Sequence, residues 1–229
     1  SEIHVIRERP LSKSLEVGYE AALAVGSKWS MFLDADILLR TGAMSSLAAA
    51  MNKVQPDCGL AQPYFVDKLT ISVRDGGAHI YKTYILERAL RELRGLNSAI
   101  RPESMVKLAL IQGGVQLKKI PYIVGVHDYE QSSFDVFRKG YLHGFKHSHL
   151  APQLMAKYRK LAVADEDYTV ALAGLCWGVQ SRDVPELDHS SSRYRDLWQD
   201  TAFREKPPLS DGHLDTAFVD ALLERIVAQ

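Results

Sequence analysis

The chain has 229 residues, 46% of them hydrophobic, enough for one large domain or one domain with an appendage. It carries 28 basic and 28 acidic residues, and this balance argues against a general nucleic-acid binder, which usually has a basic excess. The two cysteines, Cys58 and Cys176, lack the spacing of a metal site, so we expect free, buried thiols in a reducing, cytoplasmic compartment. No run reaches the ~18 apolar residues of a membrane span.

The residue pattern of the first two thirds predicts strands that alternate with helices. Strands are predicted over 3–6, 29–33, 59–66, 71–73 and 115–126. Helices are predicted from Ser12 or Ser14 to Val25, where Gly26 ends the helix, and over 41–54, 80–93 and 105–111. This alternation is typical of an α/β protein with a largely parallel sheet.

The last third has a different pattern. We predict a helix over 155–163, an apolar segment over 168–179, a loop over 185–195 and an amphipathic helix over 214–227. We therefore divide the chain into an α/β domain, 1–150, and a helical C-terminal extension, 151–229. The extension could pack on the first domain, form a homo-oligomer or touch a membrane surface.

Two acidic residues at the end of a buried strand form the most informative motif. Asp34 and Asp36 directly follow the predicted strand 29–33. Mg²⁺ is usually held by one or two carboxylates together with substrate phosphates, so the motif predicts a site for a metal–diphosphate complex. The alternative is that the two acids begin a turn and Asp36 caps the next helix.

Other polar residues are predicted to converge on the same edge. In α/β sheets, ligands bind outside the carboxyl ends of the strands. Asp34 and Asp36 lie at such an end, and His127 follows the apolar run 123–126. Glu103 precedes the helix that leads back to that strand. These side chains are therefore expected to share one crevice.

Four segments, in this order, carry a resemblance to a known family. They are 14–26, the DxD strand 32–36 with Met44 and Leu47 after it, the "ED…L…R…G"-like helix 101–115, and the "P…H…RK…YG"-like stretch over 121–127 and 137–144. Together they resemble an inverting family 2 glycosyltransferase with the GT-A fold. This fold is Rossmann-like, with a mostly parallel sheet flanked by helices. The match covers about residues 1–150.

The resemblance implies roles for the central residues. Asp36 would coordinate Mn²⁺ or Mg²⁺ bridging the donor diphosphate, and Asp34 would hold the donor ribose or sugar, or the metal through water. His127 would complete the metal shell or contact a phosphate. Glu103 takes the general-base position and would remove the proton from the acceptor hydroxyl. The family usually has a second acid where Ser104 stands.

The resemblance also implies donor contacts farther along the chain. Arg138 and Lys139 would steady the diphosphate or a loop over it. Asp75 and Gly77 lie where the family often has a small-residue loop facing the donor sugar. Each has a plainer interpretation, namely a turn for Asp75 and Gly77 and a solvated helix face for Arg138 and Lys139.

The implied reaction is transfer of a sugar, with inversion, from a nucleotide-sugar donor to a glycan or glycoconjugate acceptor of the cell surface. A UDP-sugar is the default donor, and the expected location is the cytoplasm, at the inner face of the membrane. Family members begin with strands that recognise the nucleotide, and residues 3–6 correspond best to the family's third strand. We therefore expect such strands upstream of this sequence.

Plainer interpretations exist for two of the site residues. Glu103 could be a solvated acid in the first turn of its helix, where it is favourable to the helix dipole. His127 could be a structural histidine at a strand end, with Asp128 orienting its imidazole. His143 and His147 have the i,i+4 spacing of metal ligands, but no companion acid motif accompanies them.

Two other functional classes fit part of the sequence. Residues 32–39 resemble the nucleophile loop of haloacid-dehalogenase-type phosphatases, in which Asp34 would be phosphorylated and Asp36 would act as general acid and base. Ile37 stands where that loop usually has Thr or Val, and no later lysine and paired-aspartate motif follows. The other class is a non-catalytic binding or assembly module derived from a glycosyltransferase.

Overall fold

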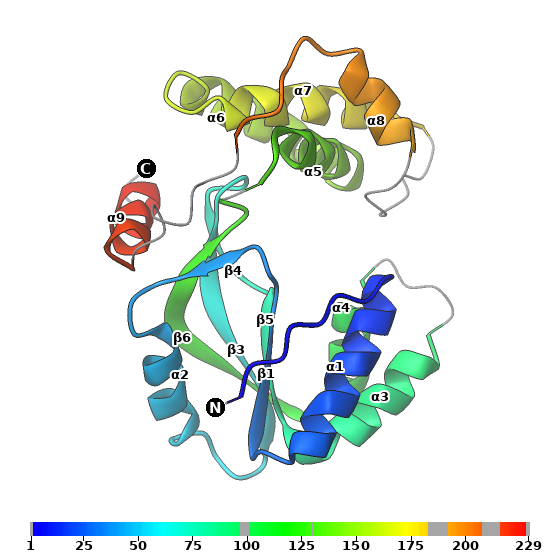
Figure 1. The fold of residues 1–229 in the computed structure, drawn as a ribbon, viewed down its shortest axis with the longest axis vertical. Helices are drawn as coiled ribbons and strands as arrows, with labels where there is room; N and C mark the ends of the chain where they lie inside the picture. Colours follow the sequence, from blue (N-terminus) through cyan, green and yellow to red (C-terminus); the bar gives the residue numbers. More distant parts are fainter. Residues whose placement is uncertain (1, 97–100, 130, 183–191, 208–215, 228–229) are drawn as a thin grey trace. The chain divides into compact units, whose positions relative to one another are not determined.

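The computed structural model describes residues 2–96, 101–129, 131–182, 192–207 and 216–227. The chain forms two compact units (Figure 1). Unit 1 comprises residues 1–66 and 73–127, and unit 2 comprises residues 67–72 and 128–229. The expected boundary at residue 150 thus lies inside unit 2, because the helix that begins at Ser133 packs with the helices that follow it.

Unit 1 is built on a six-stranded sheet in the order β1-β5-β3-β6-β2, with β4 paired to β3. The strands are β1 (Trp29–Leu33), β2 (Ile37–Leu39), β3 (Cys58–Asp67), β4 (Ser72–Asp75), β5 (Ala78–Lys82) and β6 (Gln116–His127). The helices are α1 (Leu11–Val25), α2 (Ala43–Met51), η1 (Thr83–Ile85), α3 (Leu86–Arg94) and α4 (Pro102–Gln112).

Helices cover both faces of this sheet. On one face, Tyr19 of α1, residues of α3 and Leu110 of α4 pack on Leu60 and Tyr81. On the other face, Ala43, Leu47 and Met51 of α2 pack on Ala61, Phe65, Ile80, Ile120 and Val124. Alternate residues of each strand thus serve opposite cores, as the pleat requires. We call the first side the α4 face.

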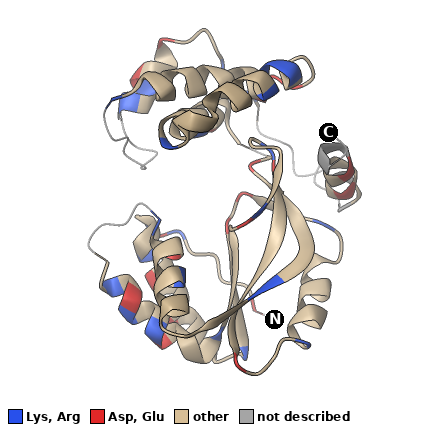
Figure 2. Cartoon of the chain, turned by 180° about the vertical axis from the view of Figure 1, so that it is seen from behind, with Lys and Arg blue, Asp and Glu red and all other residues tan. Residues whose placement is uncertain are grey.

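Ion pairs add to the packing between α1 and α3. Arg94 contacts the carboxylates of Glu16 at 2.7 Å and Glu20 at 2.6 Å. Figure 2 shows segments of both signs interspersed in this part of unit 1. These side chains are largely exposed, so the pairs contribute little beyond the apolar contacts beneath them.

The sheet is mixed and nearly closed, and this corrects the expectation of a mostly parallel, Rossmann-like sheet. The pairs β1–β5, β2–β6 and β3–β5 are all antiparallel. Parallel neighbours need crossover connections of a dozen or more residues. The links between β1 and β2 and between β4 and β5 are far shorter, so they cannot join parallel neighbours.

Two predicted elements of unit 1 differ from the structure. The predicted helix 80–93 begins only at Leu86, and residues 78–82 form β5 instead. His79 and Tyr81 lie on one face of this strand and Ile80 on the other, so it is apolar on both sides and lacks clean alternation. Residues 3–6 form no strand in the structure. Pro63 lies inside β3, and the strand continues through it, although proline cannot donate a backbone hydrogen bond.

Unit 2 is helical. Its elements are α5 (Ser133–Lys146), η2 (Ser148–Leu150), α6 (Ala151–Leu161), α7 (Asp167–Gln180), α8 (Ser192–Gln199) and α9 (Thr216–Val227). The predicted loop 185–195 is wrong at its end, since α8 begins at Ser192, and its residues 185–191 lie outside the described part. A core around Phe137, Tyr158, Ala171 and Leu175 joins α5, α6 and α7.

Glycines bring the backbones of α5 and α7 into contact. Gly140 and Gly144 of α5 and Gly174 and Gly178 of α7 each have the same spacing of four residues. A Cβ atom at Gly174 would lie 2.0 Å from the Phe137 carbonyl oxygen, and one at Gly178 would lie 2.0 Å from that of Tyr141. The two helices therefore pack at a distance that only glycine permits here.

Both cysteines are free, with Cys58 buried and Cys176 half-buried. Among the described residues, no helix combines the length and the apolar character that crossing a bilayer requires.

Candidate functional site

Asp34 and Asp36 lie in the turn that joins the two ends of the strand order. β1 and β2 are consecutive along the chain but stand at opposite ends of the sheet order. The Asp34 backbone N–H donates to the Gly77 carbonyl oxygen at 2.8 Å, and the Ile37 N–H donates to that of Asp34 at 3.3 Å. The sheet thus curls until its ends meet at the two acids. Asp36 caps no helix, because α2 begins six residues after Ile37 with Gly42 as its N-cap.

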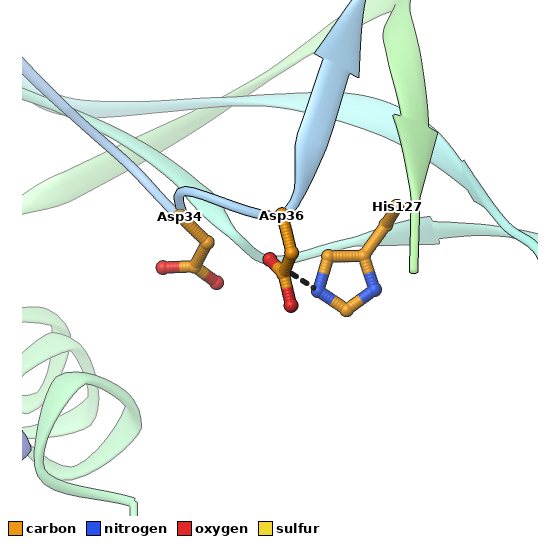
Figure 3. Close-up of side chains that lie close together, drawn as sticks. All are labelled: Asp34, Asp36 and His127. Carbon is orange, nitrogen blue, oxygen red and sulfur yellow. Dashed lines mark ion pairs between the residues drawn. The ribbon is translucent and has the colours of Figure 1, made fainter. Parts of the chain in front are cut away.

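Strand pairing brings His127 to the same place. Ile37 of β2 is paired with His127, the last residue of β6. The His127 imidazole Nε2 lies 3.3 Å from Asp36 Oδ1. Figure 3 shows both carboxylates and the imidazole pointing to the same side of the turn. The expected convergence of Asp34, Asp36 and His127 is therefore present.

Gly77 completes the wall of this group. Its φ is +62°. A Cβ atom there would lie 2.8 Å from Ile37 Cδ1, 3.1 Å from Asp34 Oδ2 and 3.7 Å from His127 Cδ2. Both the backbone conformation and the space therefore require glycine. Gly77 is brought to the site, although it lines it without offering a ligand side chain.

The chemistry of these side chains suits a divalent cation. One ligand atom each from Asp34, Asp36 and His127 lies within 4.8 Å of the others. Asp34 is exposed, whereas Asp36 and His127 are half-buried, so solvent reaches the group from the side of Asp34. The His127 ring packs on Phe65 with centroids 4.9 Å apart, which limits its rotation. Two carboxylates and an imidazole fit Mn²⁺ better than Mg²⁺, which prefers oxygen ligands alone.

Glu103 lies in the first turn of α4, on the α4 face of the sheet. Its Oε2 is buried and accepts no hydrogen bond from any residue that the structure describes. Ser104 Oγ is 3.3 Å from Oε1. Burial and the Glu103 carboxylate both raise the pKa of Tyr19, whose ring packs edge-on against Phe32. Glu103 is therefore not the solvated helix-end acid of the plainer interpretation.

Glu103 is not part of the three-residue metal group. Phe32, which packs with the core of the α4 face, lies near the end of β1, just before the turn that holds Asp34.

Asp75 does not join the metal group either. It lies at the end of β4 and forms an ion pair with Lys119 of β6. The Gly76–Gly77 turn, in which both glycines have positive φ, follows directly. The predicted contact of Asp75 with the donor sugar stays a prediction.

Arg138 and Lys139 belong to unit 2. Arg138 is 5% exposed and contacts Asp135 at 3.3 Å. Lys139 forms an ion pair with Asp128. Neither residue lies on a solvated helix face, so that plainer interpretation is wrong. Their predicted role at a diphosphate stays a prediction.

Three polar residues that the sequence reasoning missed also lie on the α4 face. Lys107 and Lys119 both donate to Gln62 Oε1, at 3.2 Å and 3.0 Å. Gln62 is fully buried within an otherwise apolar stretch of β3. A polar residue inside a predicted buried strand was the available signal, because burying an amide costs free energy unless it forms hydrogen bonds.

The histidines after α5 form no such centre. The rings of His143 and His147 lie 6.1 Å apart, and those of His147 and His149 lie 6.2 Å apart. Within the described ranges, the groups able to hold a metal do not include them.

The fold and the site define an α/β protein with a candidate divalent-metal centre at the turn between β1 and β2. No family model, curated protein or solved structure matches the chain.

Proposed function

We propose that this protein is a metal-dependent glycosyltransferase that transfers a sugar from a nucleotide-sugar donor to a glycan or glycoconjugate acceptor with inversion. The observation that carries the proposal is the convergence of Asp34, Asp36 and His127 within 4.8 Å. Unit 1 also contains a buried carboxylate oxygen, Oε2 of Glu103, that accepts no hydrogen bond from a described residue. The sequence resemblance to inverting family 2 glycosyltransferases supplies the reaction class.

Asp34, Asp36 and His127 would hold Mn²⁺ or Mg²⁺. A divalent cation supplies Lewis-acid stabilisation of the charge that develops on a leaving nucleoside diphosphate. The protein's part is to fix these ligands, which the strand pairing of Ile37 with His127 does before any ion binds. Gly77 leaves space beside Asp34 for the donor.

Glu103 would act as the general base. The proton on the attacking acceptor hydroxyl passes to a Glu103 carboxylate oxygen as the hydroxyl oxygen attacks the anomeric carbon and the bond to the diphosphate breaks. Oε2 is suited to this because it is buried and accepts no hydrogen bond from a described residue. General-base catalysis contributes about 10²–10⁴-fold in rate.

The experiment is calorimetric titration of UDP, GDP, dTDP and CMP, each with and without Mn²⁺. We expect one nucleotide to bind only with metal, and Asp36→Asn to weaken that binding at least about 100-fold, since loss of even an outer-shell partner costs 10–100-fold. Asp57→Asn is the matched control, because Asp57 is exposed and lies in the turn before β3.

The opposite result has a clear meaning. If no nucleotide binds in the presence of Mn²⁺, the chain has no working donor site and the proposal is wrong. Release of phosphate from a phosphomonoester, lost in Asp34→Asn, would instead favour the phosphatase class.

A further inference from the structure

A second polar cluster lies on the α4 face, outside the metal group. It consists of Gln62 on β3, Lys107 on α4 and Lys119 on β6. The two ammonium groups share one acceptor, because both donate to Gln62 Oε1, at 3.2 Å and 3.0 Å. Two like charges are thus held close together, which is unfavourable unless an anion offsets them.

The cluster has a buried floor and a partly open rim. Gln62 is 0% exposed, while Lys107 and Lys119 are half-buried. The Gln62 amide nitrogen is buried and donates to no acceptor among the described residues. The side chain is held instead by the two lysines on its oxygen. Its position therefore fixes both lysines while leaving them within reach of a ligand.

The positive charge of the cluster is only half compensated within hydrogen-bonding range. Lys119 is paired with Asp75. Lys107 forms no ion pair with any residue that the structure describes, although Glu103, one helical turn away, attracts it. Burial lowers the pKa of both lysines, because the charged form loses water. An ammonium group has three donors, and Lys107 uses one of them, on a neutral amide.

A third basic group beside the cluster is not charged near neutral pH. Burial, helped by Lys107, lowers the pKa of His79 to about 4. The local cations are therefore Lys107 and Lys119, and the local carboxylates are Asp75 and Glu103. If Glu103 is a base that must stay available, Lys107 needs a different partner.

We propose that Lys107 and Lys119, fixed by Gln62, form a subsite for an anionic group on the acceptor sugar, either a carboxylate or a phosphate. The assignment to the acceptor rests on the proposed function, because Lys107 lies one helical turn beyond Glu103 on α4. Charge-assisted hydrogen bonds from two ammonium groups would orient the acceptor while Glu103 meets its hydroxyl. The acceptor is then acidic rather than neutral.

The test uses the whole chain without donor and measures sugar binding by NMR titration. D-Glucuronate and glucose 6-phosphate are the anionic probes, and D-glucose is the neutral one. We expect one anionic probe to bind at least about tenfold more tightly than glucose. Tighter binding of glucuronate indicates a carboxylate, and tighter binding of glucose 6-phosphate indicates a phosphate.

Variants separate binding from folding. Lys107→Met should remove the preference for the anionic sugar, and Lys107→Arg should restore part of it. Lys118→Met is the matched control, because Lys118 is the exposed neighbour on β6, and it should leave the preference unchanged. An unchanged far-ultraviolet circular dichroism spectrum and urea unfolding midpoint in each variant verify that the chain is folded.

Two results would overturn the inference: equal binding of all three sugars, or an unchanged preference in a folded Lys107→Met variant. Failure of the proposed function looks different. In that case no nucleotide binds with Mn²⁺, whereas the anionic sugar still binds and still depends on Lys107.

Discussion

Glu103 lies in the first turn of α4. Its buried oxygen Oε2 accepts no hydrogen bond from any described residue. In a solvated helix-end acid, water would satisfy both oxygens. A buried oxygen without a hydrogen bond costs about 1–3 kcal/mol of folding free energy. Glu103 is therefore a candidate for a catalytic role rather than a stabilising one.

We expect Glu103→Gln to lower turnover by about 10²–10⁴-fold while nucleotide affinity stays nearly unchanged, because base removal acts on the chemical step. Initial rates of sugar transfer and calorimetric titration of the nucleotide measure the two quantities. Glu87→Gln is the control, because Glu87 is also an acid in a first helical turn but is exposed. Turnover equal to that of the unaltered chain would remove Glu103 from the mechanism.

At this scale the sequence predicted the convergence of Asp34, Asp36 and His127. Asp34 and Asp36 were evident because they follow the apolar run 31–33, and His127 was evident because it follows the apolar run 123–126. Gln62 was not, because its partners come from α4 and β6, and hydrogen bonds between distant elements leave no periodic signal. Asp75 was placed near the site by the sequence, but its partner is Lys119.

At the scale of elements, the contact between α5 and α7 is the most constrained feature of unit 2. Each glycine of the two pairs faces a carbonyl oxygen of the other helix, at 2.0–2.3 Å from where a Cβ would lie. Backbone atoms cannot move aside as a side chain can, so any substitution must push the helices apart.

Gly174→Ala is expected to lower the free energy of unfolding of unit 2 by about 1–3 kcal/mol. Alanine gains about 1 kcal/mol in helix propensity, but the clash with the Phe137 carbonyl outweighs it. Urea unfolding followed by circular dichroism gives the measurement. Gly18→Ala in α1 is the control, because its nearest neighbour is the movable ring of Phe32 at 3.1 Å. A Gly174→Ala variant as stable as the unaltered chain would contradict the tight packing.

The paired glycines could have been read from the sequence, since the same four-residue spacing occurs at 140 and 144 and at 174 and 178. The pairing of α5 with α7 could not be predicted, because the spacing of the glycines does not indicate which helix they contact. The misassigned start of the 80–93 helix has another cause. β5 is buried on both faces, and a short strand of this kind cannot be told from a buried helix by periodicity alone.

At the scale of the whole molecule, the two units have separate cores and different buried charges. In unit 1, burial and Lys107 lower the pKa of His79 to about 4. In unit 2, burial opposes ionisation of Asp167, but Lys68 and Lys206 still lower its pKa. Burial likewise opposes the charge on Lys68, yet Asp167 and Asp165 raise its pKa. The units should therefore respond differently to acid.

We expect acid to weaken unit 1 before unit 2. The unfolded chain protonates His79 near pH 6.5, whereas the folded unit resists until about 4, so stability falls across that window by about 3 kcal/mol at most. Asp167 contributes stability that is lost only as pH falls below the ordinary carboxyl value of 3.8. The contribution of Lys68 is lost only as pH rises above 10.5.

Hydrogen exchange of peptides from β5 and α7, corrected for intrinsic rates, measures the two units separately. Protection in β5 should fall between about pH 6.5 and 4.5 while that in α7 holds. His79→Gln should make β5 insensitive to this change. Parallel loss in both units would contradict the assignment to His79.

The α/β class was predictable from alternating patterns, but the mixed sheet was not. Strand direction depends on which strands become neighbours, and the order β1-β5-β3-β6-β2 follows from pairing over long sequence distances. The unit boundary at 127–128 was missed for a related reason. Residues 67–72 pack with the later helices although they lie between two parts of unit 1 in the sequence. The residue pattern does not indicate this assignment.

The turn that joins β1 to β2 takes its shape from main-chain bonds, namely Asp34 N–H to Gly77 and the pairing of Ile37 with His127. None of these bonds involves the carboxylates or the imidazole. The main chain of this turn is therefore held by bonds separate from the side chains that would bind an ion. Exchanging one ligand for another would change which ion is preferred without asking the sheet to refold. A scaffold of this kind can diverge in chemistry faster than in shape.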